Sequence, residues 1–246
     1  MDFTFRIVTP VYNAEQWIGK CIRSVLEQND ENWTQIIIDD GSTDDTLEMA
    51  YDTAQSDERV IIVPGHENRG VMHSHLLGHN FFTNESKEDV FVHLDGDDWF
   101  YSKESLRLIR SAYDTFDSWA SYGNYIATDD SPSVCRYWDF SKNPVRRGIL
   151  EGWPFSHVRT FKKFLWDELE DSDFRDCNGE YYTAACDTAI MCPILEMAAN
   201  KVAFFNSPLL VYNRGNPLNE DKAAMHEQVR CALDVAAKKS KTKYTK

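Results

Sequence analysis

Four short apolar runs alternate with amphipathic segments over the first 116 residues, and this alternation restricts the fold more than any other feature. The runs are rich in β-branched residues and end in turn-forming residues, which predicts strands at 3–9, 35–39, 59–63 and 90–94. Apolar residues at helical spacing predict helices at 15–27, 45–55, 70–82 and 103–116. Strands joined through helices by short connections predict a mostly parallel sheet covered on both faces, a three-layer αβα sandwich.

The pattern becomes less regular after Ser118. We expect the two halves of one domain at 1–118 and 119–237, followed by a basic, disordered tail at 238–246. Within the second half the sequence predicts strands at 122–127 and 202–212, helices at 155–165, 181–199 and 222–237, and loops at 129–152, 167–178 and 213–221.

Polar residues follow three of the first four predicted strands, at 9–13, 39–42 and 95–98. The carboxyl ends of parallel strands share one edge of a sheet, where open α/β sheets bind ligands. Asp95, Asp97 and Asp98 would repel one another unless a divalent cation lay among them, and Mg²⁺ or Mn²⁺ prefers such oxygen ligands. The alternative for this stretch alone is an acidic turn before a helix that Ser102 caps.

The net charge and the spacing of the cysteines argue against several classes of function. The net charge of −14 argues against non-specific nucleic-acid binding, and it means that a phosphate ligand would need a bridging metal or local arginines. The six cysteines form no CxxC pair, so they indicate neither a zinc site nor a redox motif. No apolar run is long enough to span a membrane and no signal-peptide pattern opens the sequence, so a cytoplasmic protein is expected.

Four motifs occur in a fixed order: Thr-Pro-x-Tyr-Asn at 9–13, Ile-Ile-Ile-Asp-Asp-Gly-Ser-Thr-Asp-Asp-Thr at 36–46, Asn-Arg-Gly at 68–70, and Leu-Asp-Gly-Asp-Asp at 94–98. This ordered set resembles the family-2 group of inverting, nucleotide-sugar-dependent glycosyltransferases with the GT-A fold. The resemblance covers residues 3–110 and, more loosely, 150–220. It implies a single GT-A domain and a nucleotide-sugar donor, with UDP-sugars favoured.

The resemblance also implies roles for individual residues. The nucleoside would be bound by Thr9, Pro10, Tyr12, Asp40, Asn68 and Arg69. Tyr12 would stack on the base and Asp40 would accept a hydrogen bond from a base N–H; the alternative for Asp40 is a helix N-terminal acid. The rest of the nucleotide-sugar would be bound by His75, Asp95, Gly96, Asp97, Arg159 and Arg214. Asp95 would meet the ribose or metal-bound water, and Asp97 and Asp98 would hold Mn²⁺ or Mg²⁺. Arg214 belongs to a loop that would close over the diphosphate.

The helix at 70–82 departs from the family pattern. Ser74-His75-Leu76 stands where family members often carry Ala-Arg-Asn, so His75 is expected to take over the polar role of the arginine. His73, His75 and His79 have helical spacings that suit a metal ion. We interpret them as ordinary surface or pocket histidines, because a diphosphate-bound metal prefers oxygen ligands.

Inverting transfer needs a base that takes the proton of the acceptor hydroxyl. The family usually supplies an acid that opens a helix in the second half, and Asp187 is the match, although Cys186 stands where a second acid is usual. The alternative for Asp187 is a solvated helix residue. Rival bases are Asp173, Asp176 and Glu180.

These features predict a metal-dependent inverting glycosyltransferase. The acceptor stays open among glycans, lipid-linked sugars, proteins and modified nucleic-acid bases, although the negative charge disfavours a nucleic acid. Two alternatives are a nucleotidyltransferase, which would need a glycine-rich basic loop after the first strand, and a non-catalytic sugar-binding module, which would not need the carboxylate cluster. The lysine-rich tail could touch a polyanion or a membrane surface, or be merely solubilising.

Overall fold

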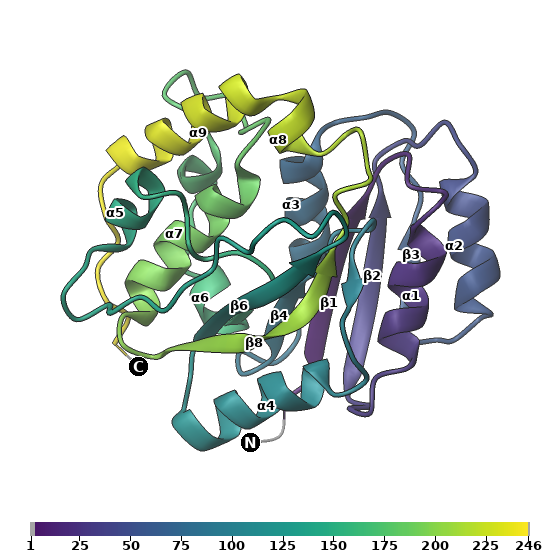
Figure 1. Cartoon of the computed structure of the whole chain (residues 1–246), viewed down its shortest axis with the longest axis horizontal. Helices are drawn as coiled ribbons and strands as arrows, with labels where there is room; N and C mark the ends of the chain where they lie inside the picture. The colour runs from purple at the N-terminus through teal and green to yellow at the C-terminus, as the bar shows by residue number, and fades with distance from the viewer. Residues whose placement is uncertain (1–2, 246) are drawn as a thin grey trace.

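Eight strands form one continuous sheet in the computed structural model, which describes residues 3–245 (Figure 1). The strands are β1 Phe5–Val11, β2 Trp33–Asp39, β3 Val60–Val63, β4 Val90–His93, β5 Trp99–Phe100, β6 Ala120–Ala127, β7 Arg159–Lys162 and β8 Val202–Tyr212. Their order is β3-β2-β1-β4-β7-β6-β8-β5. β1 to β4 pair in parallel, β7 runs antiparallel between β4 and β6, and β6 pairs in parallel with β8.

The helices cover both faces of this sheet (Figure 1). They are α1 Ile18–Leu26, α2 Thr46–Ala54, α3 Val71–Phe81, α4 Ser105–Phe116, α5 Val145–Leu150, α6 Lys163–Trp166, α7 Cys186–Ala198, α8 Glu220–Ala223 and α9 Met225–Ala237, with a short 3₁₀ helix η1 at Asp171–Phe174. Among the described residues, no helix combines the length and apolar character that crossing a bilayer demands.

Two hydrophobic cores follow from the alternation of side chains along the strands. Ile7 of β1 and Ile37 of β2 point to the face covered by α1 and α4. Val8 and Ile36 point to the opposite face, which α3 and α7 cover. Since both faces are covered, the central strands are apolar throughout, and the expected three-layer architecture with a mostly parallel sheet is confirmed.

The segment at 155–165 is not the expected helix, because its centre forms β7. β7 pairs with β4 so that Lys162 lies opposite Val90 and Arg159 lies opposite His93. All four β7 residues are buried, and the Lys162 ammonium reaches Glu88 at 2.6 Å. Cationic residues such as those in this segment are typical of a solvated helix face. The spacing of apolar residues in the sequence could not indicate that they are buried.

The lysine-rich tail was expected to be disordered, but several of its residues contact α5, α7 and the 3₁₀ helix η1. The Lys241 N–H donates to Glu196 at 2.8 Å, and the Tyr244 N–H donates to the Met197 carbonyl at 3.0 Å. The Tyr244 ring stacks on Phe164 with centroids 4.9 Å apart. These contacts give the tail a packing role that its composition does not reveal.

A close approach of α3 to β1 depends on Gly78. A Cβ at this position would lie 2.5 Å from Val8 Cγ1. We expect Gly78→Ala to lower the free energy of unfolding by about 1–2 kcal/mol, because the strain exceeds the ~1 kcal/mol gained in helix propensity. Urea unfolding measures the change. Asn80→Ala, at an exposed site of the same helix, is the matched control and should alter stability by less than about 0.5 kcal/mol; equal effects would contradict the packing argument.

Candidate functional site

A cavity of about 360 Å³ lies at the carboxyl ends of β1, β2 and β4. Residues from both halves of the chain line it. The predicted residues among them are Pro10, Tyr12, Asp40, Asn68, His75, Asp95, Gly96, Asp97, Arg159 and Asp187. Acids from neighbouring strand tips therefore share one hollow rather than facing separate regions of solvent.

The strand tips are tied to one another by backbone contacts. The Gly96 N–H donates to the Pro10 carbonyl at 3.0 Å, and the Asp40 N–H donates to the Val11 carbonyl at 2.8 Å. A Cβ at Gly96 would lie 2.7 Å from the side chain of Val11. Glycine at this position therefore lets the end of β4 approach the end of β1, which brings the acids to the cavity.

Asp40 organises the loop before α3. Its carboxylate accepts the N–H of Arg69 at 2.9 Å and the N–H of Gly70 at 2.8 Å. This places Asn68 in the cavity wall, while the side chain of Arg69 is exposed and lies outside the lining. Asp40 thus has a structural role that the sequence did not indicate.

The three acids after β4 lie in a poorly solvated environment. Burial and the charge of Asp95 raise the pKa of Asp97 to about 6. Burial and the charges of Asp97 and Asp95 raise the pKa of Asp98 well above its usual range. Asp97 accepts a hydrogen bond from the Asn216 amide at 2.7 Å. These like charges favour a compensating cation.

The donor set at this point fits a divalent cation. Asp98 is fully buried; its Oδ1 accepts the Asn213 N–H at 2.8 Å, and its Oδ2 has no hydrogen-bond partner among the described residues. Asp95, Asp98 and His157 each offer one ligand atom, and these atoms lie within 4.8 Å of one another. Carboxylate oxygens are the ligands that Mn²⁺ and Mg²⁺ prefer. The closest set thus pairs Asp98 with Asp95 and His157, whereas the sequence suggested Asp97 and Asp98.

Arg159 connects the two sides of the cavity. Its side chain is 5% exposed, and its guanidinium lies 3.6 Å from Asp95 Oδ2 and 3.5 Å from Asp187 Oδ2. It also donates to His157 Nδ1 at 2.7 Å. Burial and the charge of Arg159 lower the pKa of His157 well below its usual range, so this imidazole is neutral. Arg159 therefore fixes an acid from each half of the chain.

Asp187 lies in the first turn of α7 and in the cavity wall. One carboxylate oxygen accepts the Thr188 N–H at 2.7 Å, and the other faces Arg159. The rival acids do not line the cavity: Asp173 pairs with Lys241, Asp176 pairs with Arg230, and Glu180 is exposed. Asp187 is the best-placed base among the predicted candidates.

Besides Arg69, two other predicted residues, Thr9 and Arg214, lie outside the cavity lining. Thr9 is fully buried and its hydroxyl accepts a hydrogen bond from Gln35 at 3.0 Å, so it belongs to the core and does not shape the cavity. Arg214 lies 3.4 Å from Asp129 and is outside the cavity lining. Asn216 and Tyr212, from the same segment, line the cavity instead. The sequence indicated that this segment contributes to the site. It did not indicate that Tyr212 and Asn216 are the residues that line the cavity.

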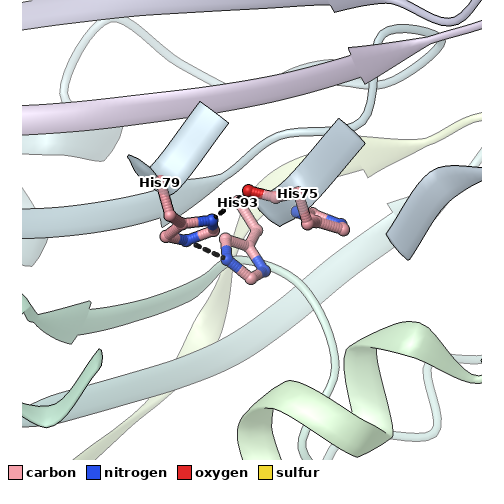
Figure 2. Close-up of side chains that lie close together, drawn as sticks. All are labelled: His75, His79 and His93. Atoms are coloured by element: carbon pink, nitrogen blue, oxygen red, sulfur yellow. Dashed lines mark hydrogen bonds between the residues drawn. The ribbon is translucent and has the colours of Figure 1, made fainter. Parts of the chain in front are cut away.

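Three histidines, His75, His79 and His93, lie close together, as Figure 2 shows. His75 lines the cavity but is only 2% exposed, and burial lowers its pKa well below the usual range. It is therefore neutral and does not supply the positive charge of the arginine that it replaces. His79 is neither a surface nor a pocket residue, because it is 1% exposed and stacks on Trp166 at 3.8 Å. The third member, His93, was not singled out from the sequence.

Comparison with known proteins agrees with the site. The model of the family described as glycosyl transferase family 2 matches residues 6–167. The glycosyltransferase GlyG of Streptococcus pneumoniae is 22% identical over 230 residues, which cover 87% of this chain and 72% of GlyG. The chain spans only 18%, 27% and 39% of the length of three other curated relatives that it matches.

Solved structures show the same architecture. Residues 1–349 of Staphylococcus aureus TarS in complex with UDP-GlcNAc align with a TM-score of 0.69 and 16% identity, covering 90% of this chain and 61% of that one. Mycobacterium tuberculosis glucosyl-3-phosphoglycerate synthase, in complex with Mn²⁺, UDP and glucosyl-3-phosphoglycerate, aligns with a TM-score of 0.58 and 19% identity, covering 94% and 78%. The chain belongs to glycosyl transferase family 2 and has the GT-A fold.

The raised pKa of Asp97 predicts a pH-dependent gain of stability on its removal. Well below the ordinary pKa of 3.8, the carboxyl is protonated in both the folded and the unfolded chain, so its removal does not change stability through ionisation. Above about 6 it is ionised in both states, and only the folded state suffers the poor solvation. We expect Asp97→Asn to stabilise the metal-free protein by about 1–2 kcal/mol at pH 8, a value discounted because the side chain faces the cavity, and by much less at pH 4.5.

Urea unfolding of both proteins in the presence of a chelator, from pH 4.5 to 8, measures this difference. Asp187→Asn, a second acid of the same cavity wall, is the control for a general loss of negative charge. A difference between Asp97→Asn and wild type that does not change with pH would contradict the account.

Proposed function

We propose that the protein transfers a sugar from a UDP-sugar to an acceptor hydroxyl, with inversion at the sugar carbon and with the help of a divalent cation. One observation carries the proposal: Asp95 and Asp97, after β4, and Asp187, which opens α7, line a single cavity, and Arg159 bridges Asp95 and Asp187. The family and the structural similarity to UDP-bound proteins support the choice of donor.

The cation would be held by Asp95, Asp98 and His157, with Asp97 beside them. When bound, Mn²⁺ or Mg²⁺ neutralises the negative charge of the leaving diphosphate. The protein's own part is to hold these acids close together despite their repulsion. Arg159 does this for Asp95, and the Asn213 N–H and the Asn216 amide do it for Asp98 and Asp97.

The nucleoside would occupy the part of the cavity between the ends of β1 and β2. Tyr12, Asp40 and Asn68 line this part and offer an aromatic face, a carboxylate and an amide. The Asp40 oxygens that accept the Arg69 and Gly70 N–H groups keep further lone pairs for a base N–H.

Asp187 would act as the base. Inversion requires the acceptor hydroxyl to attack from the side opposite the leaving diphosphate, so the base must lie across the cavity from the diphosphate site. α7 provides Asp187 from the second half of the chain, whereas the carboxylate ligands of the cation follow β4 in the first half. Arg159 holds the Asp187 carboxylate in place, and the proton of the acceptor would pass to the oxygen that faces the cavity.

Thermal unfolding with ligands tests the donor site. We expect UDP and Mn²⁺ together to raise the Tm by about 5 °C at ligand concentrations of about 100 Kd, because only the folded protein assembles this site. Either ligand alone should have a much smaller effect. Asp97→Asn should remove the joint effect, and a shift with UDP alone that Mn²⁺ does not increase would contradict a cation-assisted donor site.

Asp187→Asn separates binding from chemistry. We expect the joint UDP and Mn²⁺ shift to persist while turnover falls by about 10²–10⁴, since the amide cannot accept the proton. UDP release, on the donor–acceptor pair that wild type uses in a panel screen, measures turnover. Glu180→Gln removes a rival acid that is exposed and outside the cavity and should leave turnover unchanged. Normal turnover by Asp187→Asn would exclude Asp187 as the base.

A further inference from the structure

Three imidazoles from two elements form a buried group next to the cavity. His75 and His79 are one turn apart on α3, and His93 is the last residue of β4 (Figure 2). Their exposed fractions are 2%, 1% and 2%. One ring nitrogen of each lies within 4.8 Å of those of the other two. The proposed glycosyl transfer makes no use of this group as a unit.

The tautomers of two rings follow from their hydrogen bonds. His79 Nδ1 lies 2.7 Å from the His75 carbonyl, which can only accept, so Nδ1 carries the proton. His79 Nε2 therefore presents a lone pair, and it faces His93 Nε2 at 3.0 Å. An Nδ1–H that donates to a backbone carbonyl is the arrangement that orients metal-binding histidines through Nε2.

The hydrogen bonds between these histidines do not pair all of their ring nitrogens. If His93 Nε2 donates to His79, then His93 Nδ1 is a bare acceptor, and it has no partner among the described residues. His75 Nδ1 is also buried without a partner in that part of the chain. Unpaired buried nitrogens cost stability, and a metal ion that accepts the lone pair of His75 would remove part of that cost.

We propose that His75, His79 and His93 bind one divalent transition-metal ion, with Zn²⁺ the best match, at a site separate from the carboxylate cluster. Neutral imidazoles suit Zn²⁺, whereas the oxygen ligands after β4 suit Mn²⁺ or Mg²⁺. The two sites would thus select different metals. This inference does not depend on the proposed glycosyl transfer.

The His79–His93 pair needs only a small change in geometry to bind the ion. Nitrogens about 2.0–2.1 Å from a tetrahedral Zn²⁺ lie about 3.3 Å apart. His79 Nε2 and His93 Nε2 are 3.0 Å apart, so a slight opening admits the ion between them, with the His93 proton moving from Nε2 to Nδ1. His75 also lines the cavity, so the fourth coordination position can be reached from the cavity side.

The surrounding charges allow a buried cation. Arg159 adds a positive charge near these rings, but Asp95, Asp98 and Asp187 lie around Arg159 and outnumber it. The ion would connect α3 to the end of β4, two elements that carry the cavity wall. Because this set of ligands exists only in the folded chain, Zn²⁺ binding should stabilise the fold.

The test uses the full chain without a histidine tag, stripped of metal by a chelator. We expect the protein to compete with a colorimetric chelator for about one equivalent of Zn²⁺. Binding of this ion should raise the Tm of the protein by about 5 °C. His79→Gln and His93→Gln should each weaken Zn²⁺ binding at least about tenfold. His73→Gln, on the same helix but outside the group, and Asp97→Asn, in the carboxylate cluster, should bind Zn²⁺ as wild type does.

Wild-type protein loaded with Co²⁺ gives a measurement that no variant's folding can affect. Tetrahedral coordination by imidazole nitrogens should produce intense visible absorption bands, and Zn²⁺ should abolish them. The proposal fails if the wild type holds no Zn²⁺ against the chelator, if Co²⁺ gives only weak octahedral bands, or if Asp97→Asn loses the ion while His79→Gln, folded by circular dichroism, retains it.

Discussion

The cavity depends on the contacts that the guanidinium of Arg159 makes with two acids. It is buried between Asp95, from the end of β4, and Asp187, from the start of α7, at 3.6 and 3.5 Å. A buried cation and buried acids are each costly alone and tolerable only together. Arg159 reaches both acids because β7 inserts antiparallel beside β4 and places it opposite His93. The second half of the chain thus completes a site that the first half begins.

The acids after β4 illustrate how a site can be held in an unfavourable state. Burial raises the pKa values of Asp97 and Asp98, so the folded chain is strained wherever these groups are ionised. Apolar cores on both faces of the sheet and close backbone packing at Gly96 and Gly78 offset that cost. A cation that binds the acids relieves the same repulsion, which couples its binding to the stability of the fold.

The spacing of apolar residues predicted the structure well where apolar residues are buried and polar residues are exposed. The first four strands and their helices were predicted to within a few residues, and the acids after β4 were expected at a shared edge. It failed where buried residues are polar. Lys162 made β7 look like a solvated helix, and His79 looked like a surface or pocket residue although it packs on Trp166. Thr9 was expected at the cavity because it belongs to the motif. The motif does not indicate which of the alternating side chains of β1 are buried, and Thr9 is one of these.

The central claim is that the acids after β4 hold a cation in the same cavity as Asp187. A crystal structure of the protein with UDP and Mn²⁺, measured at the manganese absorption edge, tests it most directly. The account predicts one anomalous peak bound by oxygen atoms of the 95–98 segment, in contact with the diphosphate and across the cavity from Asp187. A UDP complex whose manganese peak lies away from these carboxylates, or which shows no peak at all, would contradict it.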